Sequence, residues 1–370
     1  MQNHDLRSIC ATVRMHLVPH VSMHPIKHVS GLLAGIFTLS MLLPSLAQAQ
    51  TAAAFKDIPT GTALAEAADY LRSVGVLSGY ADGTFRPDQK VNRAEAIKLI
   101  IAPLLKAEAL AALTTTPFSD IKAGDWYLPY VEAARQNSIV DGPPAKTAFN
   151  GTSPVTKMEF IKMLLLAYQI DPTSYSEISL PLSSDVTDPT AWYYPYLRYA
   201  ITASMTMVTS EGTFDPGRAL TRGDTAIILY RFLMYRNGKR TQALLSESES
   251  EILIVVGSLK ENNPEQAEFA SARALLAARG ANAGAPNQSI VQGALKITEA
   301  FRAIVRAYRA GINQQFDETI RLCGDAWNLA ATGKTLSADL ATLSDQVQTL
   351  AKNLAESARV AKAGAASSAS

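Results

Sequence analysis

Apolar residues recur at helical spacing after three similar turns in the first two thirds of the chain. Most successive apolar positions in each run fall three or four residues apart, which places them on one face of a helix. These positions are Ile97, Ile100, Ile101 and Leu104 in the first copy, Phe160, Ile161, Leu164, Leu165 and Tyr168 in the second, and Ala226, Leu229, Tyr230 and Leu233 in the third. A shorter helix is predicted before each turn, over residues Leu64–Val74, Leu128–Asn137 and Pro195–Ser204. The pattern therefore predicts three helix–turn–helix units.

Each turn ends in a phenylalanine that is followed eight residues later by a base and ten residues later by an acid. The phenylalanines are Phe85, Phe149 and Phe214, the bases are Arg93, Lys157 and Arg222, and the acids are Glu95, Glu159 and Asp224. Because neither spacing varies between copies, we interpret them as an internal repeat. A unit of this size buries too little surface to be secure alone, so we expect the three units to share one core.

The base in each copy lies inside the signature of a helix start. In a capping box, a side-chain oxygen at the N-cap accepts from the amide three residues on, whose acidic side chain reaches back. The predicted structural caps are Asn92 with Glu95, Thr156 with Glu159, and Thr221 with Asp224. Such a cap stabilises a helix by about 1 kcal/mol. It does not require a base at the position between the two ends.

From Ala243 onward the chain is alanine-rich and predicts longer helices. Two are predicted over Leu244–Leu259 and Gln266–Arg279, followed by a small-residue linker over Gly280–Gln288. Steps of four and three then continue, with breaks expected at Gly311 and Gly333, as in the seam of a coiled coil. The seam comprises Ile290, Ala294, Ile297, Phe301, Ile304, Tyr308, Phe316, Ile320, Cys323, Trp327, Leu336, Leu340, Leu343, Val347, Leu350 and Leu354. We predict an intramolecular antiparallel helical bundle, with a homo-oligomeric coiled coil as the alternative.

The start of the chain predicts export. An apolar run over Gly31–Leu43 follows Lys27 and precedes Ala47-Gln48-Ala49. A basic start, a short apolar core and an Ala-x-Ala site are typical of a secretory signal peptide. The run is shorter than the roughly 20 apolar residues that span a bilayer, so a membrane anchor is the weaker alternative. We expect cleavage after Ala49 and no membrane span in the mature chain, with translation starting at either Met1 or Met23.

These patterns divide the chain into six predicted segments. They are a signal peptide over residues 1–49, repeats over 54–112, 117–179 and 182–240, an alanine-rich helical bundle over 241–362, and a flexible tail over 363–370. Arg302, Arg306 and Arg309 line one side of a bundle helix. A solvated face is the default interpretation of that row, and a binding patch is the alternative.

The amino-acid composition excludes several kinds of partner, catalytic site and metal site. The formal net charge of +1 gives no reason to expect a nucleic-acid partner. All five histidines precede residue 50, and Cys323 is the one cysteine after it. A Ser-His-Asp triad, a Cys-His pair and a histidine-ligated zinc site are therefore excluded from the mature chain. We expect no metal site and no cofactor, and we interpret Cys323 as a buried, inert thiol.

Several motifs accompany the repeats. A Phe-x-Asp lead-in begins at Phe55 and at Phe118, and Ser183 replaces the phenylalanine in the third copy. A Trp-Tyr dipeptide begins at Trp126 in the second copy and at Trp192 in the third. The first turn reads Gly79-Tyr80-Ala81-Asp82-Gly83 before Phe85. With the three capping tetrapeptides, these motifs resemble the S-layer homology (SLH) domain over about residues 54–235. The first repeat lacks the tryptophan, the second has Lys157 and a changed turn, and the third has Val208 in place of Gly79.

The resemblance implies a mainly α fold in which three repeats form a pseudo-threefold spindle, here followed by the helical bundle. It also implies grooves between repeats that bind a cell-wall glycopolymer, either a secondary polysaccharide or peptidoglycan. Arg93, Arg222 and Lys157 would meet an anionic substituent, Trp126, Trp192 and Tyr80 would contact sugar faces, and Gly79 would let the backbone approach the ligand. The implied location is the cell wall or cell surface, facing the periplasm if an outer membrane is present.

Elementary electrostatics supports the bases as ligand contacts. A base at the first helical position lies beside unpaired amides and the positive end of the helix dipole, which together attract anions. The alternative is that these bases are solvated charges. Because the repeats are unequal, we expect one or two competent grooves, those using Arg93 and Arg222. Replacing both arginines by alanine should then abolish wall binding and leave the melting temperature nearly unchanged.

From these expectations we predict that the chain is a non-catalytic cell-envelope protein that anchors a helical domain at the cell surface. One alternative is a wall-anchored enzyme with its activity in residues 241–370, but Glu247, Glu249 and Glu251 alternate by two and would diverge on a helix. Another is an envelope tether or an oligomerising S-layer component, with homo-oligomerisation through the C-terminal helices.

Overall fold

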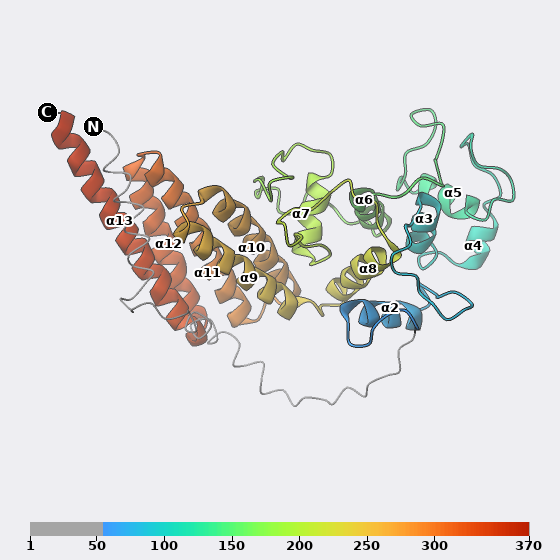
Figure 1. Cartoon of the computed structure of the whole chain (residues 1–370), viewed down its shortest axis with the longest axis horizontal. Coiled ribbons are helices and arrows are strands. Elements are labelled where there is room, and N and C mark those ends of the chain that lie inside the picture. The colour runs from blue at the N-terminus through green and yellow to red at the C-terminus, as the bar shows by residue number, and fades with distance from the viewer. Residues whose placement is uncertain (1–54, 370) are drawn as a thin grey trace. The chain divides into compact units, whose positions relative to one another are not determined.

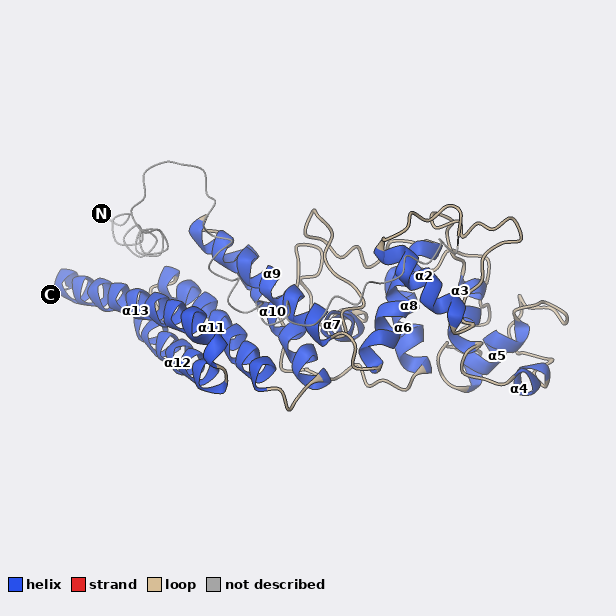
Figure 2. Cartoon of the chain, turned by 90° about the horizontal axis from the view of Figure 1, so that it is seen from below, coloured by secondary structure: helices blue, strands red, loops and turns tan. Residues whose placement is uncertain are grey.

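The regular structure of this chain is helical. The computed structural model describes residues 55–369, and within that range the named elements are α-helices and one short 3-10 helix, with no named strand (Figures 1 and 2). The mainly α prediction is therefore confirmed. The predicted signal peptide lies outside the described residues. Among the helices described, none combines the length and apolar character that crossing a bilayer requires.

Contacts between Cα atoms divide the described chain into two compact units. The repeat unit comprises residues 55–177 and 188–237, and the bundle unit comprises residues 178–187 and 238–369. The lead-in of the third repeat, Ile178–Thr187, thus groups with the C-terminal helices rather than with its own repeat. The repeat pattern in the sequence did not predict this assignment.

Two helices make up each repeat, joined by a turn. Their bounds are α2 Ala63–Ser73 and α3 Arg93–Ile101 in repeat 1, α5 Leu128–Gln136 and α6 Lys157–Ala167 in repeat 2, and α7 Tyr194–Thr202 and α8 Arg222–Arg236 in repeat 3. A short helix, α4 (Ala107–Ala111), follows α3 at the end of the segment assigned to repeat 1. The predicted first helices agree with α2, α5 and α7 to within two residues at each end.

The helices pair across repeats in a cyclic order. The first helix of each repeat packs against the second helix of the preceding one, so α5 packs against α3 and α7 against α6. Helix α2 of repeat 1 packs against α8 of repeat 3 and closes the cycle. The three repeats therefore form a pseudo-threefold unit in which no repeat completes its own helix pairing.

A closed ring of backbone hydrogen bonds lies at the centre of this cycle. The amide of Val91 donates to the carbonyl of Leu220, the amide of Leu220 donates to Val155, and the amide of Val155 donates back to Val91, each at 3.0 Å. Each of these residues directly precedes the N-cap of a second helix. The three side chains are at most 1% exposed. The ring therefore fixes the three helix starts against one another inside the shared core.

In repeats 1 and 2 the lead-in aspartate fastens the turn in front of the second helix. In repeat 1, Oδ1 of Asp57 accepts from the amide of Phe85 and Oδ2 accepts from Arg86, both at 2.7 Å. Asp120 accepts in the same way from Phe149 and Asn150, at 2.8 and 2.7 Å. The residue after each phenylalanine has a positive φ: 59° at Arg86, 57° at Asn150 and 49° at Asp215. Burial opposes ionisation of Asp57, but the two amide bonds outweigh it and hold its pKa below the usual value.

Five long helices form the bundle unit. They are α9 Thr241–Lys260, α10 Pro264–Gly284, α11 Ser289–Ile312, α12 Phe316–Leu336 and α13 Ala341–Ala369, with a 3-10 turn, η3, over Ala338–Leu340. Each helix packs against the next one along the chain, and α11 also contacts α9 and α13 (Figure 1). The connections are short, so neighbouring helices run antiparallel, as the intramolecular bundle prediction requires.

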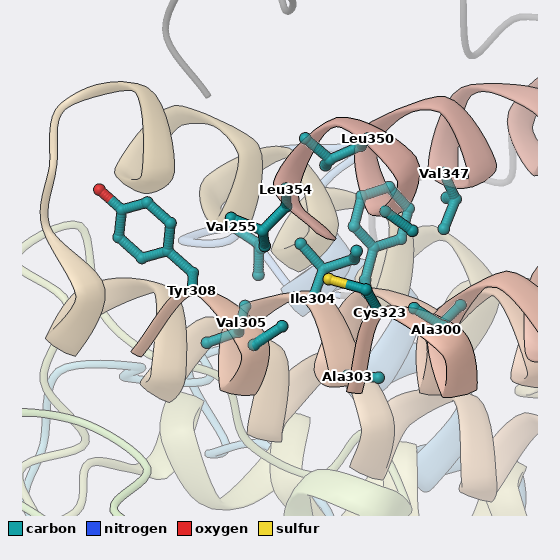
Figure 3. Close-up of a cluster of buried hydrophobic side chains, with 14 of the residues drawn as sticks. Val255, Ala300, Ala303, Ile304, Val305, Tyr308, Cys323, Val347, Leu350 and Leu354 are labelled. Atoms are coloured by element: carbon teal, nitrogen blue, oxygen red, sulfur yellow. The ribbon is translucent and has the colours of Figure 1, made fainter. Parts of the chain in front are cut away.

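Small and branched apolar side chains fill the bundle core. Figure 3 shows Ile304 of α11 beside Cys323 of α12; Tyr308 of α11 and Leu354 of α13 belong to the same buried cluster. The predicted seam is wrong at Trp327, which is 42% exposed. The buried stripe of α12 instead runs through residues that include Leu322, Cys323, Ala326, Ala330 and Gly333. Alanine and glycine at the interface allow α12 to lie close to its neighbours.

Three further segment predictions are wrong. Residues 280–284 of the expected linker continue α10, and residues 363–369 of the expected flexible tail continue α13. Gly311 and Gly333 lie inside α11 and α12 rather than at breaks. Each helix continues beyond its glycine before the chain turns. In the turn between α11 and α12, Gln314 takes a φ of 58°.

Gly333 of α12 lies in close contact with α11. A Cβ added at Gly333 would lie 2.9 Å from Cδ1 of Ile297 and 3.2 Å from the carbonyl oxygen of Gly293. Conversely, a Cβ at Gly293 would lie 3.1 Å from the carbonyl oxygen of Gly333. Gly324, nine residues earlier in α12, faces open space. The two glycines of α12 therefore differ in their packing within one helix.

We predict opposite effects of alanine at these two positions. Gly333→Ala should lower the free energy of unfolding by about 1–3 kcal/mol, because the new methyl group forces α11 and α12 apart. Gly324→Ala should raise it by about 0.5–1 kcal/mol, because alanine has the higher helix propensity. Denaturant titration followed by far-UV circular dichroism measures both. Equal stabilisation by the two substitutions would contradict the close contact at Gly333.

Candidate functional site

Four amides at the start of each second helix lack helical partners. In α3, the amide of Asn92 donates to Glu95 and the amide of Glu95 donates to Asn92 Oδ1, both at 2.9 Å. The amides of Arg93 and Ala94 donate to two carbonyls of repeat 2, also at 2.9 Å. Helices α6 and α8 form the same capping boxes and donate in the same way, to repeats 3 and 1 respectively. The free amides on which the predicted anion site depended are therefore all paired with protein groups.

The side chain of each base also reaches the next repeat. Arg93 Nε donates to the carbonyl of Phe149 at 3.1 Å, Lys157 Nζ donates to that of Phe214, and Arg222 Nε donates to that of Phe85 at 2.9 Å. The carbonyl of each buried phenylalanine thus receives the base of the preceding repeat. This bond explains the fixed spacing without a ligand. Because this bond joins neighbouring repeats, we expect the replacement of Arg93 and Arg222 to lower the melting temperature as well as affect wall binding.

Arg93 keeps donors beyond this bond. Its Nη1 lies 3.2 Å from Glu159 of repeat 2, and its guanidinium stands 5.1 Å from the centre of the Phe149 ring. The side chain is 20% exposed. A guanidinium carries five N–H donors, and these contacts use two of them. Arg93 can therefore hold the repeats together and still present a cation at the surface.

Lys157 differs from the two arginines. Its residue is only 5% exposed, and its single ammonium group is directed at the carbonyl of Phe214. Lys157 is the least exposed of the three bases and therefore the least accessible to a polymer. The structure therefore gives Lys157 a place between repeats 2 and 3 rather than on the surface.

Tyr80 lies among arginines. The guanidinium carbon of Arg86 is 3.8 Å from the centre of its ring, and that of Arg222 is 5.0 Å away. The phenol donates to Gln89 Oε1 at 2.9 Å. Arg222 also donates from Nη2 to the carbonyl of Ser78 at 3.2 Å. The structure thus brings Tyr80 and Arg222 together, but cations already occupy the ring that was predicted to stack on sugar.

Gly79 is required by packing within repeat 1. A Cβ at this position would lie 2.4 Å from Cε1 of Phe55 and 2.8 Å from the carbonyl oxygen of Thr84. The predicted role of Gly79, close approach to a ligand, therefore has a local explanation instead. The repeats agree with it: where the third has valine, Val208, its lead-in has Ser183 instead of phenylalanine. In the third repeat, the larger residue thus stands at the glycine position and the smaller one at the phenylalanine position.

Trp126 and Trp192 lie on the surface. They are 53% and 54% exposed, so neither indole belongs to the core. Each follows a turn and precedes a tyrosine that caps the next helix, with a T-shaped ring contact to that tyrosine at 5.4 and 5.7 Å between centroids. Tyr127 and Tyr193 thereby hold the indoles at the starts of α5 and α7.

A lysine of the preceding repeat stands against each indole. Lys98 Nζ is 5.5 Å from the centre of the Trp126 ring, and Lys162 Nζ is 5.8 Å from that of Trp192. Both lysines lie five residues after the base, on α3 and α6, and sequence reasoning missed them. The corresponding position in repeat 3 is Ile227, facing a repeat that lacks the tryptophan. Comparing positions beyond the capping tetrapeptide would have found this pair.

The structure therefore distributes the predicted residues over three boundaries. Arg93 and Trp126 lie between repeats 1 and 2, and Lys157 and Trp192 lie between repeats 2 and 3. Arg222 meets Tyr80 between repeats 3 and 1. Within residues 55–369, no group of three or more His, Cys, Asp and Glu side chains is arranged to hold a metal ion.

We predict that Gly79→Ala acts on stability. The new methyl group displaces the Phe55 ring, and the free energy of unfolding should fall by about 1–3 kcal/mol. Gly217→Ala is the matched control, since a Cβ there meets nothing within 4 Å. Thermal unfolding of both variants measures the difference. Unchanged unfolding of Gly79→Ala would contradict the packing role and restore a ligand role for this glycine.

Comparison with known proteins agrees with the repeat architecture. The family described as S-layer homology domain matches residues 54–97, 117–161 and 184–226. The chain is 29% identical over 170 residues to the surface-layer 125 kDa protein of Lysinibacillus sphaericus, an alignment that covers 45% of this chain and 14% of that protein. It is also 29% identical over 148 residues to the surface layer protein of Brevibacillus choshinensis, covering 40% and 13%.

A third relative carries an enzyme name. The exoglucanase XynX of Acetivibrio thermocellus is 29% identical over 172 residues, which covers 46% of this chain and 15% of that protein. The chain thus aligns with about a seventh of the length of each of these relatives. The three matched segments coincide with the three repeats that share one hydrogen-bonded ring. This chain contains three S-layer homology domains, followed by a helical C-terminal region.

Proposed function

We propose that this chain is a non-catalytic cell-envelope protein that binds a cell-wall glycopolymer through its repeat unit and anchors the helical bundle at the cell surface. The three S-layer homology domains and the surface-layer names of similar proteins support a cell-surface, wall-anchoring role. The polymer is a secondary polysaccharide or peptidoglycan. Export by the predicted signal peptide and a position on the cell wall are parts of the same proposal.

The observation that carries this proposal is the repeated pair of an exposed indole and a lysine. Single exposed apolar residues are normal on protein surfaces. Here, however, Trp126 and Trp192 are more than half exposed at equivalent positions, and each has a lysine of the preceding repeat within 6 Å of its ring. A core role would bury the indoles, and a purely solvated lysine would not recur against each of them.

These groups suit an acidic sugar polymer. The flat, electron-rich face of an indole packs against the C–H face of a sugar ring, and a neighbouring cation meets its acidic substituent. Between repeats 1 and 2, Lys98 supplies that cation and Arg93 adds its remaining guanidinium donors, which are suited to a carboxylate. We therefore propose the surface around Trp126, Lys98 and Arg93 as the principal binding surface.

The second proposed surface surrounds Trp192 and Lys162, between repeats 2 and 3. This choice differs from the expectation that Arg222 defines the second groove. Arg222 is bonded to two backbone carbonyls and stands against Tyr80 and Phe85, at a boundary without tryptophan and with Ile227 in place of the lysine. We propose that the boundary between repeats 3 and 1 serves to close the spindle.

The enzyme alternative gains no support from the acidic run in α9. Glu247 pairs with Arg240 at 3.2 Å, and Glu251 pairs with Arg273 at 2.7 Å. Glu249 is the remaining acid of this run, and burial raises its pKa. One such carboxyl without a converging partner does not make the two-carboxylate site that glycoside hydrolysis uses. Self-association through the C-terminal helices stays a prediction.

We predict that Trp126→Ala and Trp192→Ala each weaken wall binding. Loss of one stacking platform should cost about 1–2 kcal/mol of binding free energy, or about a five- to thirtyfold loss in affinity. The double variant should no longer co-sediment with isolated cell-wall sacculi. Because both indoles are exposed, the melting temperature should change little.

Trp327→Ala is the matched control for this experiment. It removes an indole that is 42% exposed, but from α12 of the bundle, and its sedimentation should equal that of the parent chain. Equal losses in all three single variants would point to general adhesion of exposed indoles. Full binding by the Trp126→Ala, Trp192→Ala double variant would contradict the proposed surfaces.

A further inference from the structure

A depression of about 470 Å³ opens on the surface of the bundle unit between α10, α11 and α12. Leu275, Leu322 and Leu329 contribute apolar lining, one from α10 and two from α12. Arg279, Arg302 and Arg306 add guanidinium groups from α10 and α11. The volume lies in the range of roughly 300–1,000 Å³ that is typical of small-molecule sites, and seven of the eleven lining residues are polar or charged.

Arg302 is held in a fixed position at this site. Its Nη1 donates to Ser271 Oγ at 2.8 Å and its Nη2 lies 3.3 Å from Glu268 Oε1, while its side chain is only 11% exposed. Burial, together with the charge of the neighbouring Arg306, lowers the pKa of Arg302 to about 10. Two guanidinium groups thus face one partly desolvated space, where a bound anion would relieve their repulsion.

The acids that line the depression are already paired with cations. Glu299 accepts from Lys296 at 2.7 Å and from Arg279 at 3.3 Å. Asp325 accepts from Arg321 at 2.8 Å. These ion pairs compensate both carboxylates of the lining. Outside the lining, hydrogen bonds from Arg321 lower the pKa of Glu318, and the charge of Arg306 adds to that effect.

Arg306 is the cation of this site that is available to a ligand. It is exposed, and it makes no hydrogen bond or ion pair within the described residues 55–369. It lies one helical turn after Arg302 on α11, so both side chains project to the same side of the helix. The guanidinium therefore combines free donors with a neighbouring apolar wall.

We propose that this depression binds a small organic monocarboxylate, with the carboxylate on Arg306 and an apolar body against Leu275, Leu322 and Leu329. The planar fork of a guanidinium matches a carboxylate with two parallel hydrogen bonds. The apolar lining favours a ligand with a short hydrocarbon portion. This site is independent of the proposed wall-binding surfaces.

Isothermal titration calorimetry on the full chain tests this proposal, with hexanoate as the probe. We expect saturable binding of hexanoate, and at least about tenfold weaker binding of hexanamide, which lacks the charge, and of inorganic phosphate, which lacks the apolar body. Arg306→Gln should weaken hexanoate binding by about tenfold or more. Arg359→Gln is the matched control, since it removes an exposed arginine of α13 that does not line the depression.

Thermal unfolding of both variants checks that the bundle remains folded. Because Arg306 makes no hydrogen bond or ion pair within the described residues, its replacement should leave the melting temperature unchanged. Absence of hexanoate binding at millimolar concentration would overturn the proposal. So would equal affinity for hexanoate and hexanamide, or equal losses in the Arg306→Gln and Arg359→Gln variants.

Discussion

The closed ring of hydrogen bonds between Val91, Val155 and Leu220 is the constraint on which the repeat unit depends. It fixes the residue before each second helix, and the first amides of each helix then donate to the next repeat. Because those amides are buried, leaving them unpaired would cost about 1–3 kcal/mol each. Each repeat supplies the carbonyls that accept from the helix start of the preceding repeat, in a closed cycle. The amides of every helix start are therefore all hydrogen-bonded only when the three repeats are assembled.

Because of this constraint, the groups that join the repeats differ from those that we propose to contact the polymer. The helix starts look from the sequence like anion sites, but their amides and the base beside them are used to join repeats. Lys157 illustrates the extreme case, with its ammonium buried against the carbonyl of Phe214. Arg93 is intermediate, since a guanidinium has donors to spare. What remains open to a polymer lies one and a half turns further along the helix, where Lys98 and Lys162 stand against exposed indoles.

The bundle unit follows different rules. Its interfaces use alanine and glycine, so helices approach closely and larger side chains are displaced to the surface. Trp327 is exposed for this reason, although its spacing fits a coiled-coil seam. The row of arginines on α11 is not uniform: Arg302 is fixed by Ser271 and Glu268, whereas Arg306 is exposed and lines a surface depression. Packing decides which members of a periodic pattern face inward.

The sequence by itself determined the repeat, its helices, the capping boxes and the family, because these depend on spacing between residues close together in the chain. Only the tertiary structure decided the roles of single side chains. Gly79 is required by the ring of Phe55, 24 residues earlier, and Arg222 reaches the carbonyl of Phe85, 137 residues away. Local pattern carries no information about such partners. Helix periodicity likewise could not place Trp126 at the surface, since exposure depends on what the neighbouring repeat brings beside it.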